Sequence, residues 1–404
     1  MIAVFINNKL ISTDTILPLV MELHRTAETG SIRFYTSSQF TYDEICLNTV
    51  LYDAIQSVGE FCFIGAKSRT LLARLLSRLL FLPLILKFFF AARIGQLTII
   101  HFGILDVWPF RMLYYVARNR TFKFEQTPIG HSQKESEIDS IERMRKPLLA
   151  KPAACMSVGF RHMEASGIVL DSETAPPTLL HPPVLRTKAW TDFVEARSDG
   201  YLNQDFDRAG IAPKSEILTF MLGYFGKLDF LISESIQLEL FHKTIETLLE
   251  VGEGRPIFLK PHVITNREVL KDALMRYRGK PIVVSYLHPA VLASRSRLFV
   301  ASYYSTTLSI AKGMGVPTIE FSGYTDKALA LTKGGSVRPD LVDYFINLTQ
   351  SDFMKVVQLL LSGTPPISKF NTGVAEINSG LFQVLLQKIT VEKLMHLNDV
   401  KIRP

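Results

Sequence analysis

The sequence predicts an α/β protein made of two doubly wound halves, each with a parallel sheet that helices cover on both faces. Short, continuously apolar runs alternate with helix-length segments through most of the 404 residues. Strands of a parallel sheet are buried on both faces, so they read as uninterrupted apolar runs. The length favours two domains over one or three. The alternation also stops and restarts once, near the middle of the chain.

The composition excludes several other classes of protein. Hydrophobic residues make up 47% of the chain and charged residues 21%, as in an ordinary globular protein with a full core. Disorder, collagen-like order and a coiled coil therefore fit poorly. The net charge is +7, but much of the basic excess lies among Leu, Ile and Phe. Because a nucleic-acid surface needs its basic residues on a polar face, we expect no nucleic-acid partner.

The first alternating series fills the N-terminal half. Strand-like apolar runs lie at residues 3–6, 31–35, 61–64, 97–104 and 121–125. Helix-like patterns lie at residues 14–24, 42–58 and 110–118. Together they predict a first domain over residues 1–175.

A proline-rich stretch separates the two series. Its prolines are Pro176, Pro177, Pro182, Pro183 and Pro213. Proline rigidifies connections and interrupts helices, so residues 176–213 are expected to form a linker with some short helix. The alternation then restarts and predicts a second domain over residues 214–404. Strands are expected there at residues 216–222, 256–260, 282–285, 298–301 and 318–321, with helices at 234–251, 271–277 and 306–313.

A loop rich in hydroxyl groups follows the apolar strand at residues 298–301. Ser305, Thr306 and Thr307 lie where the next helix begins. A helix N-terminus offers unpaired N–H groups and a partial positive charge, which suits a phosphate. The alternative is plain N-capping, which accounts for one hydroxyl residue more readily than for three in a row.

A second polar motif, Lys260-Pro261-His262, ends the strand at residues 256–260. Lys260 supplies a point charge for a phosphate, and His262 supplies a second donor when it is protonated. A structural or solvent-exposed histidine is the alternative. The strand–helix–strand spacing predicts that this motif and the hydroxyl loop lie at the same edge of one sheet.

Together these motifs resemble those of a known enzyme class. The Ser/Thr cluster opens a helix that runs into Gly-Val-Pro-Thr-Ile-Glu at residues 315–320, and Lys-Pro-His precedes it. Over about residues 218–321 this pattern is similar to bacterial glycosyltransferases of the GT-B architecture, which has two Rossmann-like domains facing a central cleft. The nearest kin resemble enzymes that use CMP-activated sialic acid or Kdo, including lipooligosaccharide sialyltransferases and capsule polymerases. CDP-glycerol-type polyol-phosphate transferases share a similar pattern.

The resemblance implies roles for these residues in holding a nucleotide phosphate. His262 would protonate or hydrogen-bond the leaving phosphate, and the hydroxyl groups of residues 305–307 would bind its oxygens. Glu320 would meet the ribose, and a surface residue that caps a strand is the alternative interpretation. His288 lies in a loop expected near the nucleoside, with a structural role as its alternative.

The catalytic base is expected in the N-terminal half, because transfer to a sugar hydroxyl needs a carboxylate or histidine within hydrogen-bond reach. Glu125 follows an apolar strand and is the first candidate, with His131 in the same loop as the second. The resemblance favours both, since similar enzymes carry an acidic pair or a His-Gly at this point. Asp14 is the third candidate, and an N-cap of the helix at residues 15–24 is its alternative role.

A basic, apolar stretch predicts contact with a membrane surface. Residues 61–105 contain no acidic residue. The expected membrane contacts are Arg69, Arg74, Arg78, Phe81 and Lys87. The uninterrupted apolar run at residues 79–86 is far short of the ~20 residues that a spanning helix needs. We therefore expect a helix that lies on anionic headgroups, with a buried crossover helix as the alternative.

The expected compartment follows from the cysteines and the N-terminus. Cys46, Cys62 and Cys155 form no CxxC pair or disulfide framework, which favours a reducing compartment. The N-terminal residues show no signal-peptide pattern. We expect a cytoplasmic protein, peripheral on the inner face of the bacterial plasma membrane.

The expected function is metal-independent glycosyl transfer. A sialic acid- or Kdo-like sugar would move from a CMP-activated donor to a surface-polysaccharide or lipid-linked glycan acceptor. The nucleotide sugar is a substrate, so no cofactor is expected, and no DxD-type metal pair stands out. The alternatives are a CDP-polyol phosphotransferase, a nucleotide-sugar 2-epimerase and a non-catalytic nucleotide- or carbohydrate-binding protein. Gln126 and Val263 depart from the family pattern and keep the last alternative open.

Overall fold

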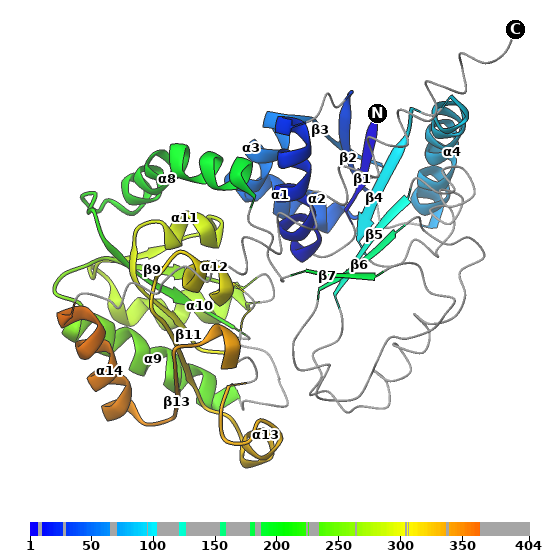
Figure 1. Cartoon of the computed structure of the whole chain (residues 1–404). Helices are drawn as coiled ribbons and strands as arrows, with labels where there is room; N and C mark the ends of the chain where they lie inside the picture. The colour runs from blue at the N-terminus through cyan, green and yellow to red at the C-terminus, as the bar shows by residue number, and fades with distance from the viewer. Residues whose placement is uncertain are drawn as a thin grey trace, which may run out of the picture. The chain divides into compact units, whose positions relative to one another are not determined.

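The computed structural model divides into two compact units. Unit 1 comprises Met1–Thr191 and Gly373–Pro404, and unit 2 comprises Asp192–Thr372 (Figure 1). The structure describes residues 1–6, 10–26, 30–64, 71–94, 96–102, 121–126, 154–158, 178–181, 187–223, 225, 234–262, 265–303, 305, 307–336 and 339–363.

In the described part of unit 1, seven parallel strands form one sheet in the order β3-β2-β1-β4-β5-β6-β7. The strands are β1 (Ile2–Phe5), β2 (Ile32–Thr36), β3 (Glu60–Phe63), β4 (Thr98–Phe102), β5 (Thr121–Gln126), β6 (Ala154–Val158) and β7 (Thr178–His181). The interior strand β1 is buried along its whole length, as expected for a strand covered on both faces.

The helices described in unit 1 are α1 (Leu10–Thr26), α2 (Gln39–Leu47), α3 (Thr49–Val58) and α4 (Leu71–Arg93). The single helix expected at residues 42–58 is in fact two helices. Asn48 ends α2, and its side-chain Oδ1 accepts a hydrogen bond from the Leu51 amide at 3.2 Å. Asparagine favours such caps because its short amide competes for backbone groups.

In the described part of unit 2, six parallel strands form the order β10-β9-β8-β11-β12-β13. They are β8 (Ile217–Met221), β9 (Ile257–Lys260), β10 (Ile282–Val284), β11 (Ser296–Ala301), β12 (Thr318–Ser322) and β13 (Tyr344–Asn347). The order reverses between β8 and β11, the doubly wound pattern of a Rossmann-like sheet.

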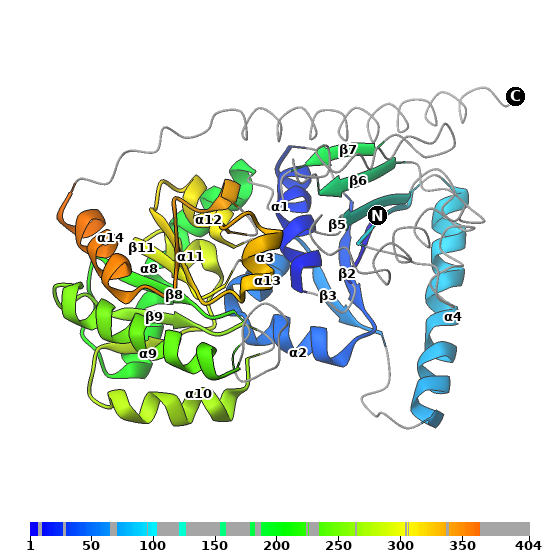
Figure 2. The same ribbon diagram turned by 90° about the horizontal axis from the view of Figure 1, so that it is seen from below.

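The first helix described in unit 2, α8 (Lys188–Ala209), begins in unit 1. The helices described after it are α9 (Glu234–Val251), α10 (Arg267–Leu274), α11 (Pro289–Ala293), α12 (Leu308–Gly313), α13 (Asp326–Leu331) and α14 (Gln350–Ser362). Residues 275–277 and 339–341 form 3₁₀ turns. Figure 2 shows α9 and α11 on opposite sides of the sheet. On the α9 face, Phe321 of β12 stacks on Phe353 of α14 with ring centroids 4.3 Å apart.

The stretch expected as a linker is largely regular. It contains β7 and the 22-residue helix α8. The carboxyl group of Asp205, on α8, is buried and accepts a hydrogen bond of 2.5 Å from the Ser285 hydroxyl. Burial raises the pKa of Asp205. This contact fixes the C-terminal half of α8 against the rest of unit 2.

Candidate functional site

The carboxyl ends of β8, β9, β11 and β12 meet at one edge of the sheet of unit 2, because all these strands are parallel. Lys260, Met221 and Ala301 are level with one another across β9, β8 and β11. With one strand between them, β9 and β11 lie about 10 Å apart. The loops that follow these strands therefore start from the same edge, as predicted from the strand–helix–strand spacing.

The reversal of strand order lies between β8 and β11. Open α/β sheets bind ligands outside the carboxyl ends of the strands at such a point. The hydroxyl loop that follows β11 is therefore one of the two loops that flank this position. The loop that follows β8 is the other.

A glycine allows these two loops to approach closely. The Gly223 amide donates a hydrogen bond of 3.2 Å to the Ser302 hydroxyl oxygen. A Cβ atom at position 223 would lie 2.4 Å from the Cβ of Tyr303, closer than real carbon atoms approach. Neither Gly223 nor Tyr303 was predicted from the sequence as a site residue. The only available signal was a glycine directly after an apolar strand.

Two of the three predicted hydroxyl residues are described, and they contact each other. The Ser305 Oγ lies 2.7 Å from the Thr307 Oγ1 and accepts a hydrogen bond of 3.3 Å from the Thr307 amide. Both side chains are half-buried. Thr306 lies outside the described residues. Since α12 has only six residues, its dipole is small, and hydroxyl groups must supply much of any anion binding here.

Lys260 and His262 occupy the end of β9. The Lys260 ammonium group donates a hydrogen bond of 3.3 Å to the Tyr286 carbonyl oxygen. His262 is exposed, and its carbonyl oxygen accepts a hydrogen bond of 2.9 Å from the Thr265 amide. The backbone turn at His262 is thus fixed while its imidazole faces solvent.

Glu320 is not a surface residue that caps a strand. It lies within β12 and is 0% exposed. The Tyr324 hydroxyl donates to its Oε1 at 2.5 Å, and the Ser336 hydroxyl donates to its Oε2. Burial outweighs these bonds and raises the pKa of Glu320 from 4.5 to about 7. Both carboxyl oxygens are engaged inside the unit, so this arrangement offers no ribose contact.

His288 has a structural role in this fold. It is 2% exposed, and its Nδ1 accepts a hydrogen bond of 3.1 Å from the Ala290 amide at the start of α11. This geometry agrees with the structural role that was the alternative for His288, because the imidazole caps a helix inside the unit.

The candidate bases belong to unit 1. Asp14 lies inside α1, which begins at Leu10, so it is not the N-cap that the sequence suggested. Glu125 lies in β5, one residue before the strand ends, and is therefore at the carboxyl edge of its sheet. His131 lies outside the described residues.

The predicted membrane residues fall in or near α4. Phe81 is 2% exposed and packs edge-on against Phe5 with ring centroids 6.5 Å apart. Its assignment as a membrane contact is therefore wrong, because the side chain is part of the core of unit 1. Lys87 is exposed. Arg74 and Arg78 lie within α4. Arg69 lies outside the described residues.

The part of the chain that the structure describes contains neither a metal-binding cluster nor a membrane-spanning helix. There, no group of three or more His, Cys, Asp or Glu side chains could hold a metal ion. Nor is any helix in the same residues long and apolar enough to cross a membrane.

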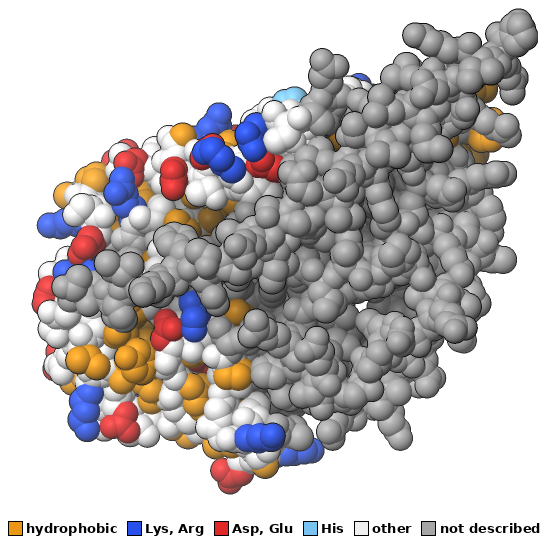
Figure 3. Space-filling model, viewed as in Figure 1, with side chains coloured by type: hydrophobic (Ala, Val, Ile, Leu, Met, Phe, Trp, Pro, Cys, Tyr) orange, Lys and Arg blue, Asp and Glu red, His pale blue; other side chains and the backbone are white. Residues whose placement is uncertain are grey.

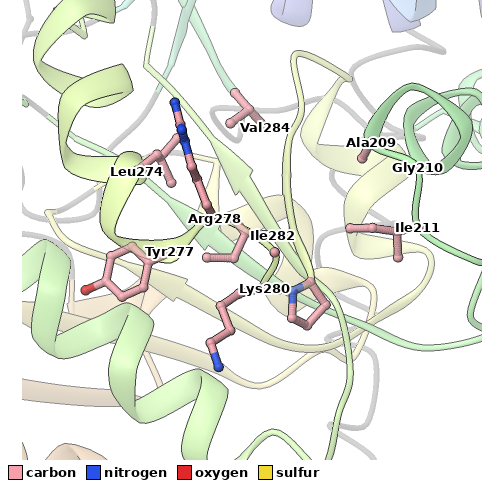
Figure 4. A pocket seen from close by; sticks show the side chains of 11 residues that line it. Ala209, Gly210, Ile211, Leu274, Tyr277, Arg278, Lys280, Ile282 and Val284 are labelled. Carbon is pink, nitrogen blue, oxygen red and sulfur yellow. The ribbon is translucent and has the colours of Figure 1, made fainter.

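A separate groove lies at the amino edge of the same sheet (Figure 4). It has a volume of about 450 Å³. Among its lining residues, Ile211 precedes β8, and Tyr277 and Lys280 precede β10. The groove is thus at the opposite edge from the loops after β8, β9 and β11.

On the face in Figure 3, the basic and acidic side chains of unit 2 are interspersed.

No family model matches the sequence, and no curated protein matches it. Solved structures do match the fold. One UDP-N-acetylglucosamine 2-epimerase aligns with a TM-score of 0.55 at 12% identity, over 100% of this chain and 97% of that chain. The UDP-GlcNAc 2-epimerase from Neisseria meningitidis, bound to UDP-GlcNAc, gives 0.54 at 11% identity over 96% and 100%. A ugt transferase from Siraitia grosvenorii, in complex with UDP, gives 0.51 at 11% identity over 96% and 100%.

These likenesses confirm the predicted fold class. The chain has two Rossmann-like α/β domains of the GT-B type, as the epimerase and transferase structures do. At 11–13% identity the likeness extends to the fold alone. The finer resemblance to enzymes that use CMP-sugars stays a prediction.

Proposed function

We propose that this chain is a glycosyltransferase that binds a nucleotide sugar at the carboxyl edge of the sheet of unit 2. The observation that carries the proposal is the position of the hydroxyl loop at the reversal of strand order, on the same edge as Lys260 and His262. That position is where doubly wound sheets bind nucleotides. Solved structures of this fold, bound to UDP-GlcNAc or UDP, add support.

The nucleotide phosphate would be held by charge and by hydrogen bonds. Lys260 supplies a fixed positive charge, and Ser305 and Thr307 supply hydroxyl donors. His262, which follows β9 and is exposed, would donate a proton or hydrogen bond to the leaving phosphate. We propose a CMP-linked, sialic acid- or Kdo-like sugar as donor, because a single phosphate can leave on such donors without a metal ion or cofactor.

In the proposed reaction, the acceptor hydroxyl oxygen attacks the anomeric carbon of the donor sugar. The bond between that carbon and the phosphate oxygen breaks, and the nucleotide leaves with the electron pair. A base takes the hydroxyl proton, and Glu125 is our first candidate, followed by His131 and Asp14. The acceptor would be a surface polysaccharide or a lipid-linked glycan.

The test is nucleotide release from CMP-sialic acid, CMP-Kdo, a CDP-polyol and UDP-GlcNAc, each with a glycan acceptor. We expect CMP release that requires the acceptor. Replacing the hydroxyl, Ser305→Ala, should weaken nucleotide binding about three- to tenfold, and His262→Ala should lower both affinity and rate. Glu125→Gln should abolish transfer and leave binding intact. Ser362→Ala is the matched control, since that hydroxyl lies at the exposed end of α14.

Release of a different nucleotide would correct the donor, and nucleotide binding without release would indicate a non-catalytic binding protein. Unchanged affinity in both the Ser305 and His262 variants would refute the phosphate site.

A nucleotide-sugar 2-epimerase is the second candidate, which the likeness to UDP-N-acetylglucosamine 2-epimerases favours. An epimerase converts the sugar without a separate acceptor. Conversion of UDP-GlcNAc to its 2-epimer, followed by NMR in the absence of acceptor, would select this candidate over transfer.

A further inference from the structure

Among the described residues, the helix α4 has two apolar faces: one packs against the core of unit 1, and the other is exposed. It connects β3 to β4 and lies along one side of the sheet of unit 1 (Figures 1 and 2). On the inner face Phe81, Ile85 and Phe88 are at most 4% exposed. Phe88 packs edge-on against Phe5 and Tyr35, with ring centroids 5.9 and 5.8 Å away. This face secures α4 to the core.

The outer face carries large apolar side chains at helical spacing. With their exposed fractions these are Leu75 (47%), Leu79 (60%), Leu82 (37%), Leu86 (59%), Phe89 (38%) and Phe90 (66%). Steps of three or four residues place them in one stripe along the helix. At 1.5 Å per residue the stripe is about 22 Å long. A solvent-facing helix of a globular protein is normally polar on this side, so an apolar stripe marks an interaction surface.

The charges around the stripe favour one kind of binding partner over another. Residues 61–105 contain no Asp or Glu, whereas Lys87 is exposed on α4 and Arg93 ends it. If two copies of this chain packed these stripes together, the helices would bring like charges together without a carboxylate of their own to pair with. An anionic lipid headgroup layer instead complements the cations, and its acyl boundary accepts Leu and Phe.

We propose that the outer face of α4 docks onto an anionic lipid bilayer, with the helix lying in the plane of the interface. Leu79 and Leu86 at the middle of the stripe would enter the acyl boundary, and Lys87 would contact headgroup phosphates. Docking rests on unit 1 and is independent of nucleotide binding by unit 2.

The test is flotation of the full chain with phosphatidylcholine vesicles that contain either ~30% phosphatidylglycerol or none, at low salt. We expect binding to the anionic vesicles that weakens as salt is added. The double variant Leu79→Gln, Leu86→Gln should bind at least about tenfold more weakly, because two apolar side chains are lost from the interface. Lys87→Gln should bind more weakly and be less sensitive to salt.

Leu359→Gln is the matched control, since Leu359 is 61% exposed on α14 of unit 2. It should bind vesicles as the unchanged chain does, and circular dichroism should show that all variants are folded. Failure of the unchanged chain to float with anionic vesicles would overturn the proposal. So would a double variant that binds normally. A dimer that the double variant converts to a monomer, with no vesicle binding, would identify a second copy as the occupant instead.

Discussion

Glu320 is a carboxylic acid that the fold of unit 2 keeps away from water. Its strand β12 is buried along its whole length, and Tyr324 and Ser336 donate hydrogen bonds to its two oxygens. Donors of this kind favour the ionised form, but burial disfavours it more strongly, so the pKa rises to about 7. The protonation state of this residue therefore changes near neutral pH, within the fold rather than at its surface.

This raised pKa predicts a specific dependence of stability on pH. Between pH 4.5 and about 7 the folded state holds a proton at Glu320 that the unfolded state has lost. Stability from this group is therefore full below the unfolded pKa and declines as pH rises through the folded one. The loss is at most about 3 kcal/mol, at 1.36 kcal/mol per pKa unit.

Glu320→Gln removes the titrating group and should remove this decline. Urea unfolding of the unchanged chain and the variant, at about pH 5 and about pH 8, measures it through the free energy of unfolding. The free energy of unfolding of the variant, relative to that of the unchanged chain, should be larger at about pH 8 than at about pH 5. Parallel pH profiles for the two proteins would show that Glu320 does not titrate in this range.

The sequence predicts which residues lie at strand ends better than it predicts whether their side chains are exposed. The predicted edge placement of Lys260, His262 and Ser305 agrees with the sheet, because parallel topology fixes which end of a strand a loop leaves. Phe81 was expected at the membrane surface and is buried, and Glu320, whose alternative role was at the surface, is buried as well. Their exposure depends on which helix or sheet covers them, and that contact is made by residues far away in the sequence.

At the scale of elements, α4 shows how position changes the effect of a proline. The helix continues through Pro83 to Arg93, although proline removes one backbone hydrogen bond. Pro83 and Leu79, whose carbonyl loses its donor, both lie on the exposed side. Water can satisfy that carbonyl, so the helix is not broken.

Two elements of unit 2 were not predicted, and a weak signal explains the strand among them. Strand β13 and helix α14 were not predicted, and β13 has only four residues, one of which is buried. A short strand with a mixed pattern cannot be told from a loop by periodicity alone. The feature that identifies β13 as a strand is its parallel pairing with β12.

The close approach of the loops after β8 and β11 gives a prediction at this scale. Gly223→Ala adds a methyl group that would lie 2.4 Å from the Tyr303 Cβ. Because that atom is next to the backbone, one of the two loops must shift. We expect an overpacking cost of about 1–3 kcal/mol and about tenfold weaker nucleotide binding, since the shift is at the proposed phosphate site.

Gly200→Ala is the matched control for this change. Gly200 lies in α8, and an added Cβ has no atom within 4 Å. It should stabilise the chain by about 0.5–1 kcal/mol, because alanine favours a helix, and leave nucleotide binding unchanged. Urea unfolding and nucleotide titration measure both effects. Equal nucleotide affinity in the two variants would mean that the loops after β8 and β11 do not form the site.

At the scale of the whole molecule, the two sheets share the same pattern of strand order. In each, the first three strands extend in one direction from the starting strand, and the later strands extend in the other. Apolar runs separated by helices predicted this arrangement, since right-handed crossovers leave few alternatives for parallel strands. The same rule places the proposed binding edge, so the fold and the candidate site follow largely from one pattern in the sequence.

The substrate does not follow from that pattern, because fold is shared by enzymes of different activity. The central claim concerns position alone: a nucleotide binds at the carboxyl edge of the sheet of unit 2. Amide hydrogen exchange with and without saturating nucleotide, read by mass spectrometry, tests it directly. We expect slower exchange in peptides that contain Gly223, His262 and Ser305. Protection confined to Ile211 and Lys280 in the groove at the amino edge, or no protection in unit 2, would contradict the claim.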